Sequence, residues 1–94
     1  MPRYKVAHIK EQGVDLIIIP LGAGFGTLSN EEQNRQRQEL QQEASASGLA
    51  GIVVPVWEMA GNRMGFLAPA SYRPFFESIN MPYVLTNLNR EIYW

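Results

Sequence analysis

Two segments of this chain are apolar on both strand faces, and they limit its fold more than any other feature. Val14–Leu21 reads Val-Asp-Leu-Ile-Ile-Ile-Pro-Leu, and Gly51–Glu58 reads Gly-Ile-Val-Val-Pro-Val-Trp-Glu. β-Branched residues favour strands, and a strand without a polar face has to be covered on both sides or packed tightly. The sequence therefore predicts a sheet built around two buried strands, with Pro55 at an edge or a bulge because it cannot donate to a ladder.

Shorter patterns predict the elements around these strands. Tyr4–Lys10 alternates in polarity and precedes Glu11-Gln12-Gly13, which predicts a hairpin with the first buried strand. Ser29 and Glu32 have the spacing of a capping box, so a helix is expected from there to Ser47, with Gly48 after its end. This helix is rich in glutamine and has a narrow apolar stripe. The other expected elements are a strand at 63–68, a helix at 69–79, a last strand at 83–88 and a tail at 89–94.

The predicted fold is a single α+β domain with the element order ββαββαβ. Its sheet is expected to be mostly antiparallel and to carry the helices on one face. The length of 94 residues suits one domain with a thin core. Two hairpin–helix units, 1–48 and 51–80, each place a proline late in an apolar strand, which suggests an internal repeat.

Charge and composition argue against several classes of function. The net charge is -1 and the eight basic residues form no run, which disfavours nucleic acid as a partner. One histidine and no cysteine predict neither a metal site nor a cofactor, and His8 is expected to be an ordinary strand residue. The apolar runs are too short to span a bilayer, and no apolar region follows the first residues. A soluble, cytoplasmic protein is expected.

Exposed aromatic residues give the leading functional prediction. The chain ends Ile92-Tyr93-Trp94, an apolar group where chains usually fray in water. A thin core and a poorly apolar helix give a reason to associate, because burial contributes about 25 cal/mol per Å² of apolar area. The prediction is a non-enzymatic interaction module that forms a homo-oligomer, such as a dimer, or binds another protein. The expected anchors are Trp57, Tyr93 and Trp94, with Arg63, Arg73 and Arg90 as rim charges.

A glycine-rich loop supports an alternative, a site for a small ligand or nucleotide. Gly22–Thr27 follows a buried strand and precedes a helix, as a phosphate-binding loop does. The spacing is GxGxG rather than GxGxxG, and two glutamates open the helix, where they would repel phosphate. The candidate ligand residues are Gly22, Gly24, Gly26 and Thr27.

The start of the chain supports a second alternative, an enzyme. Removal of Met1 would leave Pro2 with a secondary amine, which serves as a base or nucleophile when desolvation lowers its pKa. In Met1-Pro2, in size and in an immediate first strand, the chain is similar to small proteins of the tautomerase superfamily. The resemblance implies catalysis by Pro2. The chain departs from that family because a second strand, Val14–Leu21, comes before the first helix, and no arginine matches a substrate-binding position of the family.

Overall fold

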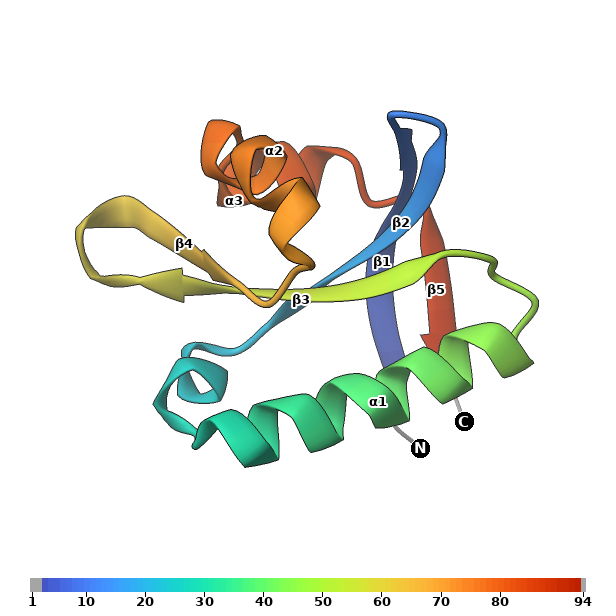
Figure 1. The fold of residues 1–94 in the computed structure, drawn as a ribbon, viewed down its shortest axis with the longest axis horizontal. Coiled ribbons are helices and arrows are strands. Elements are labelled where there is room, and N and C mark those ends of the chain that lie inside the picture. Colours follow the sequence, from blue (N-terminus) through green and yellow to red (C-terminus); the bar gives the residue numbers. More distant parts are fainter. Residues whose placement is uncertain (1–2, 94) are drawn as a thin grey trace.

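The structure of the protein is a computed structural model that describes residues 3–93. Within this range a five-stranded sheet has the order β4-β3-β2-β1-β5 (Figure 1). All neighbouring strands are antiparallel except β2 and β3, which are parallel. The α+β class and the mostly antiparallel sheet are therefore confirmed. The strands are β1 (Arg3–Glu11), β2 (Val14–Leu21), β3 (Ile52–Met59), β4 (Arg63–Phe66) and β5 (Arg90–Tyr93).

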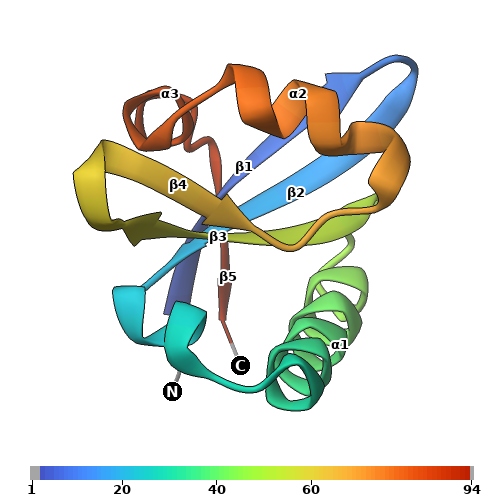
Figure 2. The same cartoon turned by 60° about the vertical axis from the view of Figure 1, so that its left-hand side comes forward.

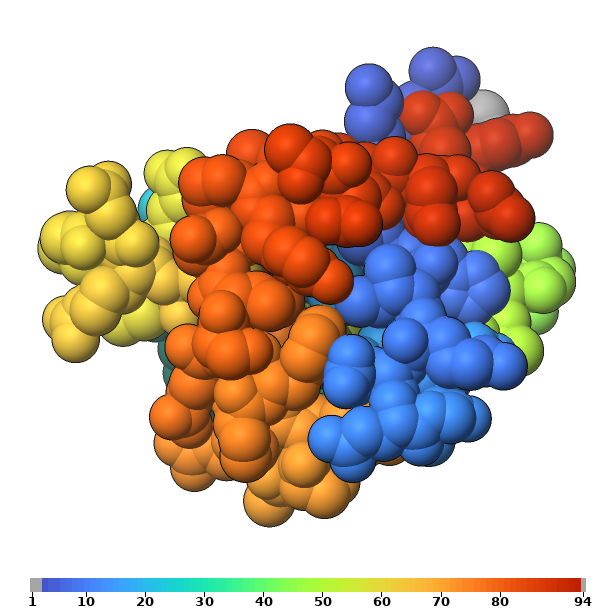
Figure 3. Space-filling view, turned by 90° about the horizontal axis from the view of Figure 1, so that it is seen from above, coloured from blue at the N-terminus to red at the C-terminus, as the bar shows by residue number. Residues whose placement is uncertain are grey.

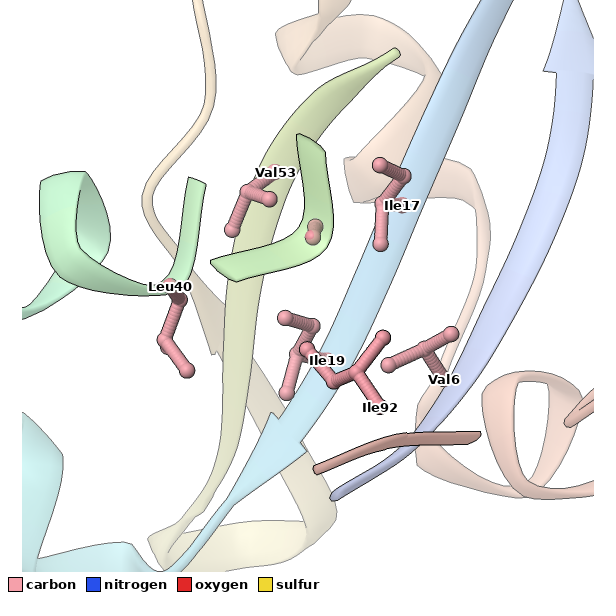
Figure 4. Packing of buried hydrophobic residues seen from close by; sticks show 7 residues of the cluster. Val6, Ile17, Ile19, Leu40, Val53 and Ile92 are labelled. Atoms are coloured by element: carbon pink, nitrogen blue, oxygen red, sulfur yellow. The ribbon is translucent and has the colours of Figure 1, made fainter. Parts of the chain in front are cut away.

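Helices cover both faces of the sheet, so the prediction that they pack on one face is wrong (Figures 1 and 2). α1 (Asn30–Ala46) lies on one side, and α2 (Arg73–Ser78) and α3 (Met81–Thr86) lie on the other. The physical reason is the double-sided apolarity of β2. Its Ile17 and Ile19 pack towards α1, as Figure 4 shows, while the alternate residues pack towards α2 and α3. A helix layer on one side alone would leave half of these residues in water.

The last third of the chain differs from its prediction. The expected strand at 83–88 is mostly α3, and β5 lies in the expected tail. Asn80 caps α3, because its side-chain Oδ1 accepts from the Tyr83 backbone N at 2.9 Å, and Pro82 fits the first turn. This Asn-Met-Pro sequence follows directly after the helix expected at 69–79, and in the structure it begins another helix. The expected helix at 69–79 is a 3₁₀ turn, η3 (Ala70–Tyr72), followed by α2.

Pro55 lies in β3, an inner strand of the sheet, so the expected edge strand is wrong and the alternative, a bulge, stays a prediction. It directly precedes Val56, which is the first residue of β3 that is paired with β4. The Leu67 backbone N donates to Pro55 O at 3.1 Å, but proline has no N–H to donate in return. Pairing with β4 ends at this point, because β4 covers only residues 63–66. After the hydrogen bond between Leu67 and Pro55, the segment that follows β4 leaves the sheet towards α2. The two hairpin–helix units are present in order, with helices on opposite faces, and the internal repeat stays a prediction.

α1 is attached to the sheet by hydrogen bonds as well as by its narrow apolar stripe. Its start shows half of the capping box, since Ser29 Oγ accepts from the Glu32 backbone N at 3.1 Å. Gln41 bridges to the start of β3: its Oε1 accepts from Val53 N at 2.9 Å and its Nε2 donates to Gly51 O at 3.0 Å. Glutamines in this helix therefore have structural roles. No helix of residues 3–93 has the length and apolar character needed to cross a bilayer.

The glycine-rich loop forms a 3₁₀ turn, η1 (Ala23–Thr27), that packs over Trp57. The Phe25 and Trp57 ring centroids are 5.0 Å apart. A β-carbon added at Gly26 would lie 2.5 Å from Trp57 Nε1, and one at Gly65 would lie 2.3 Å from the same ring. These two glycines let the backbone approach the indole from η1 and from β4. Only 9% of Trp57 is exposed.

Substitutions in this turn should show whether a glycine is needed for close packing against Trp57 or only for flexibility of the loop. Gly26→Ala is expected to lower the free energy of unfolding by about 1–3 kcal/mol, because the new methyl group displaces the Trp57 ring. Gly24→Ala, in the same turn, has open space around its new β-carbon and should change stability by less than about 0.5 kcal/mol. Urea unfolding followed by tryptophan fluorescence measures both values. Equal effects of the two variants would contradict the packing role.

Candidate functional site

The predicted site residues lie at the two edges of the sheet, in the glycine turn, on α2 and in the interior of the chain. Tyr93 and Arg90 lie in β5 at one edge, and Arg63 starts β4 at the other. Figure 3 shows these edges on opposite sides of the α2–α3 layer, with β5 in red and the β3–β4 hairpin in yellow. Trp57 is packed inside the chain. Trp94 and Pro2 lie outside the described residues.

β5 is attached to β1 through an asparagine side chain. The Asn89 backbone N donates to Val6 O at 3.0 Å. The Asn89 side chain extends the ladder beyond Arg90, the first residue of β5. Its Oδ1 accepts from His8 N at 2.8 Å, and its Nδ2 donates to His8 O at 2.9 Å. One amide side chain therefore satisfies both backbone groups of His8, as a peptide unit of a neighbouring strand would. This role of Asn89 could not be predicted from the sequence, because a contact across 81 positions leaves no local pattern.

The position of Asn89 determines which backbone groups of β5 face outwards. Because the His8 N–H and C=O point towards β5, those of Val6 and Tyr4 do so too. Their partners in the register are Arg90 and Ile92, which therefore face β1.

The backbone N–H and C=O groups of Glu91 and Tyr93 consequently point away from the sheet. They make no loop or side-chain hydrogen bond with another described residue. This edge of the sheet is open.

Side chains of both charges and one aromatic ring border the open edge. Tyr93 is 59% exposed, and the Arg3 guanidinium carbon lies 6.0 Å from its ring centroid. Arg3 Nε also lies 3.5 Å from Glu91 Oε1. Beside them is a shallow hollow of about 590 Å³. Its lining comprises Lys5, Leu85, Leu88, Asn89, Arg90 and Glu91.

Removal of the Asn89 side chain should loosen β5. Asn89→Ala leaves the His8 N–H and C=O without partners and is expected to lower the free energy of unfolding by about 1–3 kcal/mol. Hydrogen exchange of the β1 and β5 amides should accelerate as well. Asn34→Ala is the control, because Asn34 bonds only within exposed α1, and it should change stability by less than about 0.5 kcal/mol. Unchanged β5 exchange in the Asn89 variant would contradict this role.

A separate cavity lies between the β3–β4 hairpin and the start of α3. It has a volume of about 400 Å³. Glu58 and Arg63 line it from the hairpin, and neither side chain makes an ion pair or a hydrogen bond with another described residue. Gly61 and Asn62, with φ of 75° and 59°, form the tight turn that brings Asn62 to the same cavity. The rest of the lining is Met59, Asn80, Met81 and Pro82.

The remaining predicted rim charge, Arg73, does not line this cavity. Arg73 Nε lies 3.9 Å from Glu77 Oε1 on the same short helix. The structure therefore brings only one of the predicted arginines, Arg63, to a cavity together with an unpaired carboxylate.

The glycine turn borders a third cavity, of about 410 Å³, whose lining includes Gly22, Gly24, Tyr4 and Gln36 but no charged side chain. Thr27 Oγ1 donates within the turn, to Gly24 O at 2.7 Å. No cation in this lining would balance a phosphate. The ligand role of the turn stays a prediction, and its chemistry suits an uncharged group.

The nearest cation belongs to a neighbouring hollow and is already engaged. Arg35 donates through two nitrogens to the Glu32 carboxylate, with Nε 3.0 Å from Oε2. These hydrogen bonds, with a further one from Gln36, lower the pKa of Glu32 to about 2.

This pKa can be tested directly. NMR titration of the Glu32 side chain should give a value near 2, and Arg35→Gln should raise it towards 4.5. Because the folded-state pKa is depressed, the stabilisation is complete above pH 4.5 and is lost as pH falls towards 2. The control is Arg37→Gln, two residues further along the same helix, which should leave the pKa of Glu32 unchanged. An ordinary pKa in the unsubstituted protein would contradict the pairing.

No described residues form a metal-binding cluster of three or more histidine, cysteine, aspartate or glutamate side chains. His8 Nε2 lies 2.8 Å from Ala50 O and must donate to that carbonyl. Comparison of the chain with protein-family models, with curated proteins and with solved structures gave no match. The three sites described above are therefore the basis for assigning a function to this chain.

Proposed function

We propose that this domain is a protein-interaction module that associates with a second copy of itself through β5. The observation that carries the proposal is the open edge of β5, where the N–H and C=O groups of Glu91 and Tyr93 point outwards beside an exposed ring. Edge strands with free backbone groups are templates for pairing with another chain.

The direction of these groups and the charge of Glu91 together favour one register for a two-fold pair. An antiparallel pair of β5 strands places residues of the same face opposite each other. If Ile92 lies on the two-fold axis, Glu91 of one copy faces Tyr93 of the other copy. The backbones of these two residues then exchange two hydrogen bonds, and the symmetry repeats this pair once. If Glu91 lies on the axis, two carboxylates face each other, which is unfavourable. The first register joins the two sheets into one continuous sheet.

Side chains at the edge suit the same register. The Tyr93 ring of the second copy would lie on the α2–α3 face next to Glu91, where the hollow lined by Leu85 and Lys5 is found. Leu85 is 50% exposed and would gain cover from this ring. Each surface supplies both the ring and the hollow, as a two-fold interface requires.

Light scattering coupled to size exclusion, over at least a tenfold range of concentration, tests the proposal. The unsubstituted chain should form a dimer. Tyr93→Pro removes the outward N–H but leaves the bonds between β1 and β5, so it is expected to give a folded monomer.

Matched substitutions control for loss of the ring. Tyr93→Thr keeps the N–H and should weaken the dimer without abolishing it. Tyr83→Thr removes an exposed ring from α3, away from the edge, and should leave the dimer unchanged. A monomer at every concentration, or a dimer that survives Tyr93→Pro with a native circular dichroism spectrum, would overturn the proposal.

A further inference from the structure

The cavity between the β3–β4 hairpin and α3 presents two opposite charges that are free to bind a ligand. Glu58 and Arg63 both line it, yet no ion pair joins them to each other or to another described residue. Neighbouring opposite charges at protein surfaces commonly pair, as Arg73 and Glu77 do on α2. Here the hairpin register places Glu58 opposite Met64 and Arg63 opposite Met59. Side chains at adjacent positions of the ladder leave it on opposite faces, so the two charges approach the cavity from different sides of the hairpin.

The rest of the lining combines amides with apolar groups. The Asn62 side chain and Asn80 Nδ2 donate to no other described residue, and the Asn80 Oδ1 is used by the α3 cap. Met59, Met81 and Pro82 supply an adaptable apolar wall. The volume of about 400 Å³ lies in the range of small-molecule sites.

These groups together define the chemistry of a ligand. A guanidinium binds a carboxylate with two parallel hydrogen bonds, and a carboxylate such as that of Glu58 binds an ammonium group. A phosphate ester or other polyanion would be repelled by Glu58, and a simple cation would be repelled by Arg63. The cavity therefore suits a small molecule that carries one charge of each sign and an apolar side chain.

We infer that this cavity binds a free apolar α-amino acid, with Arg63 on the α-carboxylate, Glu58 on the α-ammonium group and the two methionines on the side chain. The inference is independent of self-association, because β4 and β5 are at opposite edges of the sheet. The Tyr93→Pro variant should bind the same ligand equally well.

NMR titration of the ¹⁵N-labelled protein with L-leucine tests the inference. Saturable shifts are expected at the amides of Asn62, Arg63, Asn80 and Met81. N-acetyl-L-leucine lacks the ammonium group and L-leucinamide lacks the carboxylate, so each should bind at least about fivefold more weakly, as expected for loss of a partly exposed charge contact.

Substitution of the two exposed charged residues tests which group of the ligand each of them contacts. Glu58→Gln should weaken leucine binding and abolish the preference for leucine over N-acetyl-leucine. Arg63→Gln should abolish the preference for leucine over leucinamide. Glu43→Gln and Arg37→Gln, on α1, leave the cavity unchanged and should bind leucine as the unsubstituted protein does.

The inference is overturned by three results. One is the absence of saturable shifts at leucine concentrations of tens of millimolar. The second is saturable binding whose shifts lie away from the hairpin and α3. The third is equal affinity for leucine and both blocked analogues, which would show that neither charge contacts the ligand. Spectra of each variant without ligand confirm that the fold is retained.

Discussion

The parallel pairing of β2 and β3 is the constraint on which the rest of the structure depends. Both strands are apolar on two faces, and six residue pairs, from Leu16 with Ile52 to Leu21 with Trp57, hold them side by side. A parallel connection needs a long crossover, which α1 supplies on one face. The other face then needs its own cover, and the chain provides it only after β4, as η3, α2 and α3. The arrangement of helices on both faces of the sheet follows from this central pair.

The sequence predicted the elements whose signals are local. The first hairpin depends on an alternating strand and Gly13, and α1 depends on Ser29 and Gly48; all of these were found in the structure. The last third was mispredicted because its signals conflict. Tyr83 and Val84 are typical strand residues, yet the Asn80 cap and Pro82 begin a helix there. The prediction of helices on one face failed for a different reason: it left the second apolar face of β2 without a partner.

The candidate sites were less predictable than the fold, because they depend on contacts between distant segments. Arg63 was expected to be a rim charge, but its proximity to Glu58 and Asn80 arises only when the hairpin tip lies beside α3. Trp57 was expected to be an anchor because aromatic residues are common at interfaces, and composition could not show that two glycines from separate segments approach its ring. Aromatic residues mark both cores and interfaces, and only packing separates the two.

Asn89 links the fold to the proposed interface. A strand of four residues has little pairing of its own, and a slip of one residue would exchange the inner and outer backbone groups. It would also move Glu91 into the place of Ile92, which is buried in the α1-side cluster. The Asn89 side chain opposes such a slip, because its amide matches the N–H and C=O of His8 in one register only. The outward direction of the Glu91 and Tyr93 backbone is therefore determined by a residue that lies outside the strand itself.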